Sequence, residues 1–101
     1  MSELLKVSFQ SEVIHWRGPS PFFFLKVPVK VSLAIKTISK QVSYGWGVIP
    51  CDVTIDSVQF YTALFPKEES YLVPLKKVVR EDLNIELGDR VKATIRISSG
   101  I

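Results

Sequence analysis

The chain has 101 residues, of which 47% are hydrophobic and 23% are charged. This length suits one domain with its own hydrophobic core, and the composition excludes an intrinsically disordered protein. The formal net charge of +3 is smaller than a dedicated nucleic-acid-binding face requires, although it leaves nucleic acid open as a partner. We therefore expect a single domain over residues 1–101.

The first half of the chain predicts two strands and a helix. Hydrophobic and polar side chains alternate from Leu5 to Val13, which indicates a half-buried strand. After a turn rich in glycine and proline, segment 22–27 is apolar nearly throughout, which predicts a strand buried on both faces. From Lys30 the hydrophobic residues recur at helical spacing, so we expect a helix that ends before segment 44–47.

The second half predicts a hairpin, a second helix and a last strand. Strands over 48–55 and 58–65 are separated by two residues, which is typical of a tight hairpin. Four features follow it: an exposed loop over 66–70, a short strand over 71–73, a helix over 75–83 and a strand over 91–98. Six or seven short strands with two short helices predict a mainly β fold, a closed Greek-key-like barrel.

A short motif recurs in the two halves. Val27-Pro28-Val29-Lys30 returns 46 positions later as Val73-Pro74-Leu75-Lys76, each copy lying between an aromatic strand and a helix. Val53-Thr54-Ile55 and Ala93-Thr94-Ile95 are similar to each other further along. We interpret these matches as an internal pseudo-two-fold repeat, the alternative being chance, since such residues are common at strand–helix junctions.

Two sets of residues are candidates for binding. Trp16 with Arg17, and Tyr44 with Trp46, flank turn-rich connections, where aromatic and basic side chains can stack on bases, sugars or a peptide. The alternative is that both tryptophans fill the ends of the barrel.

The second candidate set lies at the start of the second predicted helix. Lys76, Lys77 and Arg80 form the tightest basic group of the chain, and together they suit phosphate contacts. The alternative is a solvated face of the helix.

Catalytic, metal and cofactor chemistry finds little support. His15 and Cys51 are the sole histidine and cysteine, too few for a zinc site, and neither has a catalytic partner nearby in sequence. The triplet Gly45-Trp46-Gly47 lacks the spacing of a phosphate-binding loop. We expect no cofactor, no metal and, on balance, no enzyme.

Localisation follows from apolar runs and thiols. No apolar run is long enough for a signal peptide core or a membrane span, so we expect no membrane association. One thiol cannot form an internal disulfide, which suits a reducing compartment and predicts a cytoplasmic protein.

Several stretches carry a resemblance to known proteins. They are Trp16–Pro28, Gly45–Pro50, Thr54-Ile55, Thr62–Pro66 and Tyr71–Val91. Over them the chain resembles a family of small bacterial barrels, the domain of unknown function 1905. Two positions depart from the family pattern, Asp56-Ser57 in place of a Gly-Gly-like turn and Phe60 in place of tryptophan. The resemblance implies a barrel with no established activity.

A wider similarity involves Leu72–Leu75 and the turn Gly88–Val91. These segments are similar to the AbrB-type transition regulators and double-psi barrels, among which are DNA-binding dimers, antitoxins and enzyme domains. Three hypotheses follow. The first is a cytoplasmic binding module for a protein or small molecule, monomeric or homo-oligomeric. The second is a nucleic-acid-binding regulator or antitoxin, and the third is a small-ligand protein or enzyme that uses an aromatic barrel end.

Overall fold

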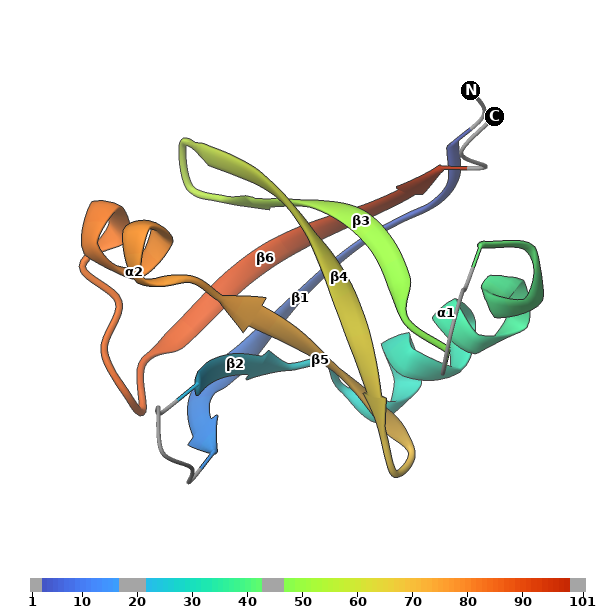
Figure 1. The fold of residues 1–101 in the computed structure, drawn as a ribbon, viewed down its shortest axis with the longest axis horizontal. Helices are drawn as coiled ribbons and strands as arrows, with labels where there is room; N and C mark the ends of the chain where they lie inside the picture. The colour runs from blue at the N-terminus through green and yellow to red at the C-terminus, as the bar shows by residue number, and fades with distance from the viewer. Residues whose placement is uncertain (1–2, 17–21, 43–46, 99–101) are drawn as a thin grey trace.

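The structure, a computed structural model, describes residues 3–16, 22–42 and 47–98 (Figure 1). The described residues form six strands and two helices: β1 (Glu3–Trp16), β2 (Phe22–Lys26), α1 (Val29–Val42), β3 (Ile49–Ile55), β4 (Val58–Lys67), β5 (Ser70–Leu75), α2 (Lys77–Leu83) and β6 (Arg90–Ser98). The strands close into an antiparallel barrel in the order β1-β2-β5-β4-β3-β6. The prediction of a mainly β, closed barrel is therefore confirmed. Of the two described helices, neither is long and apolar enough to cross a membrane.

The barrel consists of two halves with the same order of elements. Exchanging β1-β2-α1-β3 with β4-β5-α2-β6 leaves every pair of neighbouring strands unchanged. The two helices lie on opposite sides of the barrel, as Figure 1 shows. Thr54 on β3 lies directly opposite Thr94 on β6, and the two similar motifs equate these same positions. The topology thus supports the predicted internal repeat.

The core lies inside the barrel. β3 and β6 alternate between buried and more accessible side chains, as the two-residue period of a strand requires. Large side chains without exposed surface come from strands of both halves and from α1: Leu25, Ile35, Ile49, Leu64, Ile95 and Ile97. Removing each from water contributes about 1.5–3 kcal/mol, so this core is the main source of stability.

The segment predicted as a loop over residues 66–70 is mostly strand. β4 extends to Lys67 and β5 begins at the buried Ser70, so Glu68 and Glu69 alone form the turn. Glu68 takes the left-handed φ of 57° that such a tight turn needs. The prediction was wrong because polar side chains suit the outward positions of a strand end as well as they suit a loop.

The second helix is shorter than predicted. α2 begins at Lys77, and Leu75 is instead the buried end of β5. The sequence indicates an apolar stripe of Leu75, Val78, Val79 and Leu83 for this helix. Val79 is the buried residue of α2, whereas Val78 is 66% exposed and does not face the core. A helix of seven residues has two turns, so the late start leaves Val79 as its one buried residue, with the partly buried Leu83 packed against the core.

Candidate functional site

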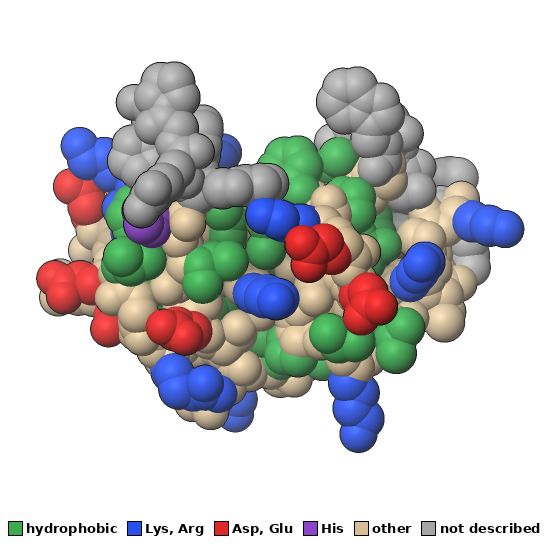
Figure 2. Space-filling view, turned by 90° about the horizontal axis from the view of Figure 1, so that it is seen from below, with side chains coloured by type: hydrophobic (Ala, Val, Ile, Leu, Met, Phe, Trp, Pro, Cys, Tyr) green, Lys and Arg blue, Asp and Glu red, His purple; other side chains and the backbone are tan. Residues whose placement is uncertain are grey.

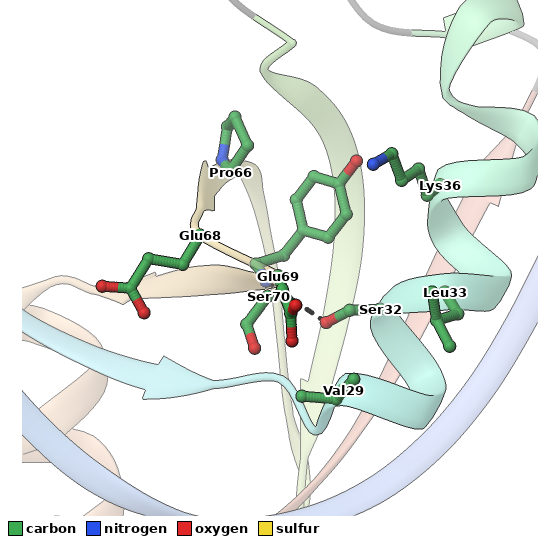
Figure 3. Close-up of a pocket in the computed structure, with 9 residues that line it drawn as sticks. Val29, Ser32, Leu33, Lys36, Pro66, Glu68, Glu69 and Ser70 are labelled. Carbon is green, nitrogen blue, oxygen red and sulfur yellow. Dashed lines mark hydrogen bonds between the residues drawn. The ribbon is translucent and has the colours of Figure 1, made fainter.

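An open hollow of about 430 Å³ lies between α1 and the β4–β5 turn. We name it the α1 hollow. The helix contributes one wall and the turn with its flanking strands contributes the other (Figure 3). Its lining residues are Val29, Ser32, Leu33, Lys36, Pro66, Glu68, Glu69, Ser70 and Tyr71.

Ser32 fixes the helical wall to the barrel. At the end of the β2–β5 ladder, the Val27 amide donates to the Tyr71 carbonyl at 2.9 Å. The Tyr71 amide donates to Ser32 Oγ at 3.2 Å, and Ser32 Oγ donates to the Val27 carbonyl at 3.3 Å. The hydroxyl therefore stands where a direct bond from Tyr71 to Val27 would complete the ladder. This relay sets the first turns of α1 against β5.

The hollow offers apolar contact on its helical side. Val29 and Leu33, one turn apart on α1, are 45% and 58% exposed, so both keep much of their apolar surface in water. Neither residue belongs to the apolar stripe that the sequence indicates for this helix, which consists of Val31, Ala34, Ile35, Ile38 and Val42. In Figure 2, which views the molecule from the side of the β4–β5 turn, hydrophobic side chains lie at the surface beside basic and acidic ones.

The two walls carry opposite charges. Lys36 on α1 is exposed, and Glu68 and Glu69 are the exposed carboxylates of the turn. In Figure 3 the Glu68 side chain points away from α1, whereas the Glu69 side chain lies on the side of the turn that faces the helix, which carries Lys36. A molecule in the hollow thus meets a cation on one wall and a carboxylate on the other.

Tyr71 lies under the hollow with 7% of its surface exposed. Burial raises the pKa of this phenol, and a hydrogen bond with the Ser39 side chain opposes the shift. The phenol therefore stays protonated at neutral pH, where it serves as a hydrogen-bonding group and not as a base.

A second hollow, of about 260 Å³, lies beside the β3–β4 turn. Its residues serve the turns themselves: Asp56 and Asn84 take left-handed φ angles of 53° and 54°. Asp89 Oδ2 accepts a hydrogen bond from the Glu86 amide at 2.9 Å, so this carboxylate closes its own loop. These roles account for Asp56, Asn84 and Asp89 without a ligand.

Most of the aromatic candidates and Arg17 lie outside the residues that the structure describes. Arg17, Tyr44 and Trp46 lie outside the described residues, and Trp16 ends β1 with a side chain that is not described. Whether these residues stack on a ligand or fill the barrel ends stays a prediction.

The basic candidates separate into two kinds. Lys76 and Lys77 are exposed at the start of α2. Arg80 is half-buried: its Nε donates to the Leu75 carbonyl at 3.2 Å, and its guanidinium lies 3.9 Å from the centre of the Phe23 ring. The fold thus engages Arg80 itself, and the structure does not gather the three cations on one free face. Their role as phosphate contacts stays a prediction.

The sole histidine and cysteine lie apart from the α1 hollow. His15 is exposed on β1 with its ring 5.9 Å from that of Phe23. Cys51 is buried in β3, where burial, and to a lesser extent Asp52, raises the pKa of its thiol to about 12. Such a thiol stays protonated and unreactive. Among the described residues, no group of three or more His, Cys, Asp or Glu could hold a metal ion.

The residues of the α1 hollow were not singled out from the sequence. One signal was present: Val29 and Leu33 are hydrophobic, four positions apart, and outside the stripe predicted to face the core. The opposing wall comes from residues 66–71, and no local pattern shows that this segment lies beside α1.

Comparison with known proteins gives one match. A family model described as a domain of unknown function, DUF1905, matches residues 9–95. Among curated proteins and among solved structures, no significant match exists. The resemblance inferred from the sequence is therefore confirmed at the level of the family.

Proposed function

The chain belongs to the DUF1905 family of domains of unknown function, and from this premise we propose that it is a binding module. Its ligand is a small zwitterionic molecule with an apolar body, held in the α1 hollow. The observation that carries the proposal is the pairing of exposed apolar side chains with opposite charges across one hollow.

The size and chemistry of the hollow support a small organic ligand. Small-molecule sites are mostly concavities of roughly 300–1,000 Å³ with apolar walls and a few polar groups, and about 430 Å³ falls within this range. Leu33 and Val29 would contact the apolar body. Lys36 would attract an acidic group and Glu69 a basic group, so a molecule such as an apolar amino acid matches both walls.

The same residues favour binding over catalysis. Among the described lining residues, the hydroxyl of Ser32 bonds to backbone groups, and the phenol of Tyr71 bonds to the Ser39 side chain. A serine nucleophile needs an adjacent base, and the described lining includes no histidine or cysteine. We place the module in the cytoplasm of a bacterium, because its one thiol suits a reducing compartment and the family resemblance is to bacterial barrels.

Three probes separate the parts of this proposal. L-phenylalanine carries both charges, its amide carries the cation alone, and N-acetyl-L-phenylalanine carries the anion alone. Titration of each into isotope-labelled protein, followed by amide chemical shifts, should perturb Leu33, Ser70 and Tyr71 most. The zwitterion should bind most tightly.

Variants assign each contact. Lys36→Gln should weaken the binding of the two probes with a carboxylate, L-phenylalanine and its N-acetyl derivative. Glu69→Gln should weaken the binding of the two probes with an ammonium group, L-phenylalanine and its amide. Each effect should be about two- to fivefold, because exposed ion pairs are weak. Leu33→Asp should weaken all three. Val78→Asp is the matched control, since Val78 is also an exposed apolar residue on a helix but does not line the hollow. Titrations that leave the hollow unperturbed, or that Leu33→Asp does not change, would overturn the proposal.

A further inference from the structure

The long ladder between β1 and β6 presents polar side chains to solvent. The two strands pair antiparallel over most of their length, and Figure 1 shows them side by side. Buried and accessible residues alternate along β6, so its even-numbered side chains point outward. Three directly opposite pairs of outward side chains follow one another along this ladder: Lys6 and Arg96, Ser8 and Thr94, and Gln10 and Lys92. We name these six residues the β1–β6 strip.

The strip is one continuous surface. β1 and β6 are hydrogen-bonded neighbours, so directly opposite side chains have their Cβ atoms about 4.5–5.5 Å apart. In the middle pair, Ser8 Oγ and Thr94 Oγ1 are 2.7 Å apart, which is a hydrogen bond across the two strands. Lys92 and Arg96 are four residues apart on β6, about 13 Å at the usual rise of a strand. The cations therefore stand on two neighbouring strands with no strand between them.

The three cations of the strip are available to a ligand. None of them forms an ion pair with the residues that the structure describes. Two carboxylates border the strip: Asp52 on β3 lies opposite Arg96, and Asp56 lines the second hollow together with Lys92. The next pair along the ladder, Glu12 and Arg90, carries one charge of each sign. The strip itself thus holds three unpaired cations, two hydroxyls and an amide, with the carboxylates outside it.

We propose that the β1–β6 strip binds the phosphate backbone of double-stranded DNA. Cationic, hydroxyl and amide side chains are the groups that contact phosphate oxygens in protein–DNA complexes. Duplex DNA carries about one negative charge per 1.7 Å of its axis, so several phosphates come within reach of a strip about 13 Å long. The strip has no aromatic side chain on which an unpaired base could stack, so it gives a single strand no advantage over a duplex. Phosphate contacts carry no sequence information, so this binding is independent of base sequence.

The test is the fluorescence anisotropy of a labelled mixed-sequence DNA duplex, titrated with the protein between about 50 and 200 mM salt. Three neutralised phosphates give a log–log slope of about −2.7, so the affinity should fall about fortyfold over this range. Lys6→Gln, Lys92→Gln and Arg96→Gln should each reduce the slope by about 0.9, which leaves a fall of about twelvefold. Arg96→Lys keeps the charge and should keep the wild-type slope.

Two controls keep the inference open to failure. Lys30→Gln removes the same charge from an exposed lysine of α1 that belongs neither to the strip nor to the α1 hollow, and it should leave the slope unchanged. The double variant Lys76→Gln, Lys77→Gln tests the start of α2 instead. No binding at low salt, an equal loss of slope for Lys30→Gln, or a slope that the double variant alone reduces would each overturn the inference. A single strand that binds more tightly than the duplex would overturn it too, because contacts with unpaired bases would then dominate. None of these results depends on the α1 hollow.

Discussion

The two helices occupy equivalent places in the repeated halves, yet they are attached to the barrel differently. The shift of 46 positions that relates Val27 to Val73 also relates Ser32 to Val78. Ser32 is 2% exposed and completes a strand ladder through its hydroxyl, whereas Val78 is 66% exposed. α1 is thus tied to β5 by a buried polar relay that α2 cannot have at the equivalent position.

The spaces beside the helices differ too. The same shift relates Glu69, which lines the α1 hollow, to Phe23, which lies under the guanidinium of Arg80. In the α2 half a cation and a ring are in contact where the α1 half has an open hollow with a carboxylate. The comparison teaches that equivalent places in the two halves of the barrel carry different side chains, and therefore different chemistry.

The largest expected effect concerns the buried residue of each helix. Ile35 of α1 has no exposed surface, so Ile35→Ala should lower the free energy of unfolding by about 2–5 kcal/mol. Val79→Ala on α2 removes fewer atoms from a short helix and should cost less. Urea denaturation measures both. An equal or larger loss for Val79→Ala would contradict the view that α1 is the more firmly attached helix.

Ser32→Ala tests the relay. It leaves the buried amide of Tyr71 and the carbonyl of Val27 without the bridging hydroxyl, so we expect a loss of about 1–3 kcal/mol. Thr37→Ala is the control, since Thr37 is exposed and its hydroxyl donates to the Ala34 carbonyl of its own helix. A Ser32→Ala protein as stable as the control would mean that Tyr71 and Val27 pair directly when the hydroxyl is removed.

A substitution of Arg80 tests how α2 is attached to the barrel. Arg80→Ala removes the contact with Phe23 and the hydrogen bond to Leu75, and should cost about 1–2 kcal/mol. Lys77→Ala, an exposed cation in the same helix, should change stability by less than about 0.5 kcal/mol. Equal losses of stability for Arg80→Ala and Lys77→Ala in thermal unfolding would show that the contact with Phe23 contributes little to the stability of the fold.

The fold was predictable where one segment carries its own pattern. The alternation of Val91, Ala93, Ile95 and Ile97 predicted β6 within a residue of its start. The apolar spacing of α1, with Pro28 before it, predicted a helix that begins within a residue of Val29. The polar residues Glu68 and Glu69 led to the wrong prediction of a loop over residues 66–70, because a strand end and a loop expose the same kinds of side chain.

The candidate site depends on contacts between distant segments. Nothing near Arg80 in sequence indicates that its guanidinium will lie over Phe23, so its charge alone suggested a phosphate contact. Lys36 and Glu69 likewise face one hollow only after β5 pairs with β2 and carries the turn beside α1. Local patterns predict elements, whereas a site formed across the repeat needs the three-dimensional arrangement.

The smallest expected effect lies at Tyr71, a titratable side chain at the α1 hollow. Burial raises the pKa of Tyr71 above its ordinary value of 10.0, so the folded protein ionises less readily than the unfolded chain. The unfolded state then binds fewer protons above pH 10, and the contribution of this group to stability, present below that pH, is lost as the pH rises. Urea denaturation of wild type and Tyr71→Phe should give a constant difference in the free energy of unfolding up to about pH 10. At higher pH the wild type should lose stability relative to Tyr71→Phe. A Tyr71→Phe curve parallel to the wild type throughout would mean that this phenol titrates alike in both states, and the hollow would then be wetter than its burial indicates.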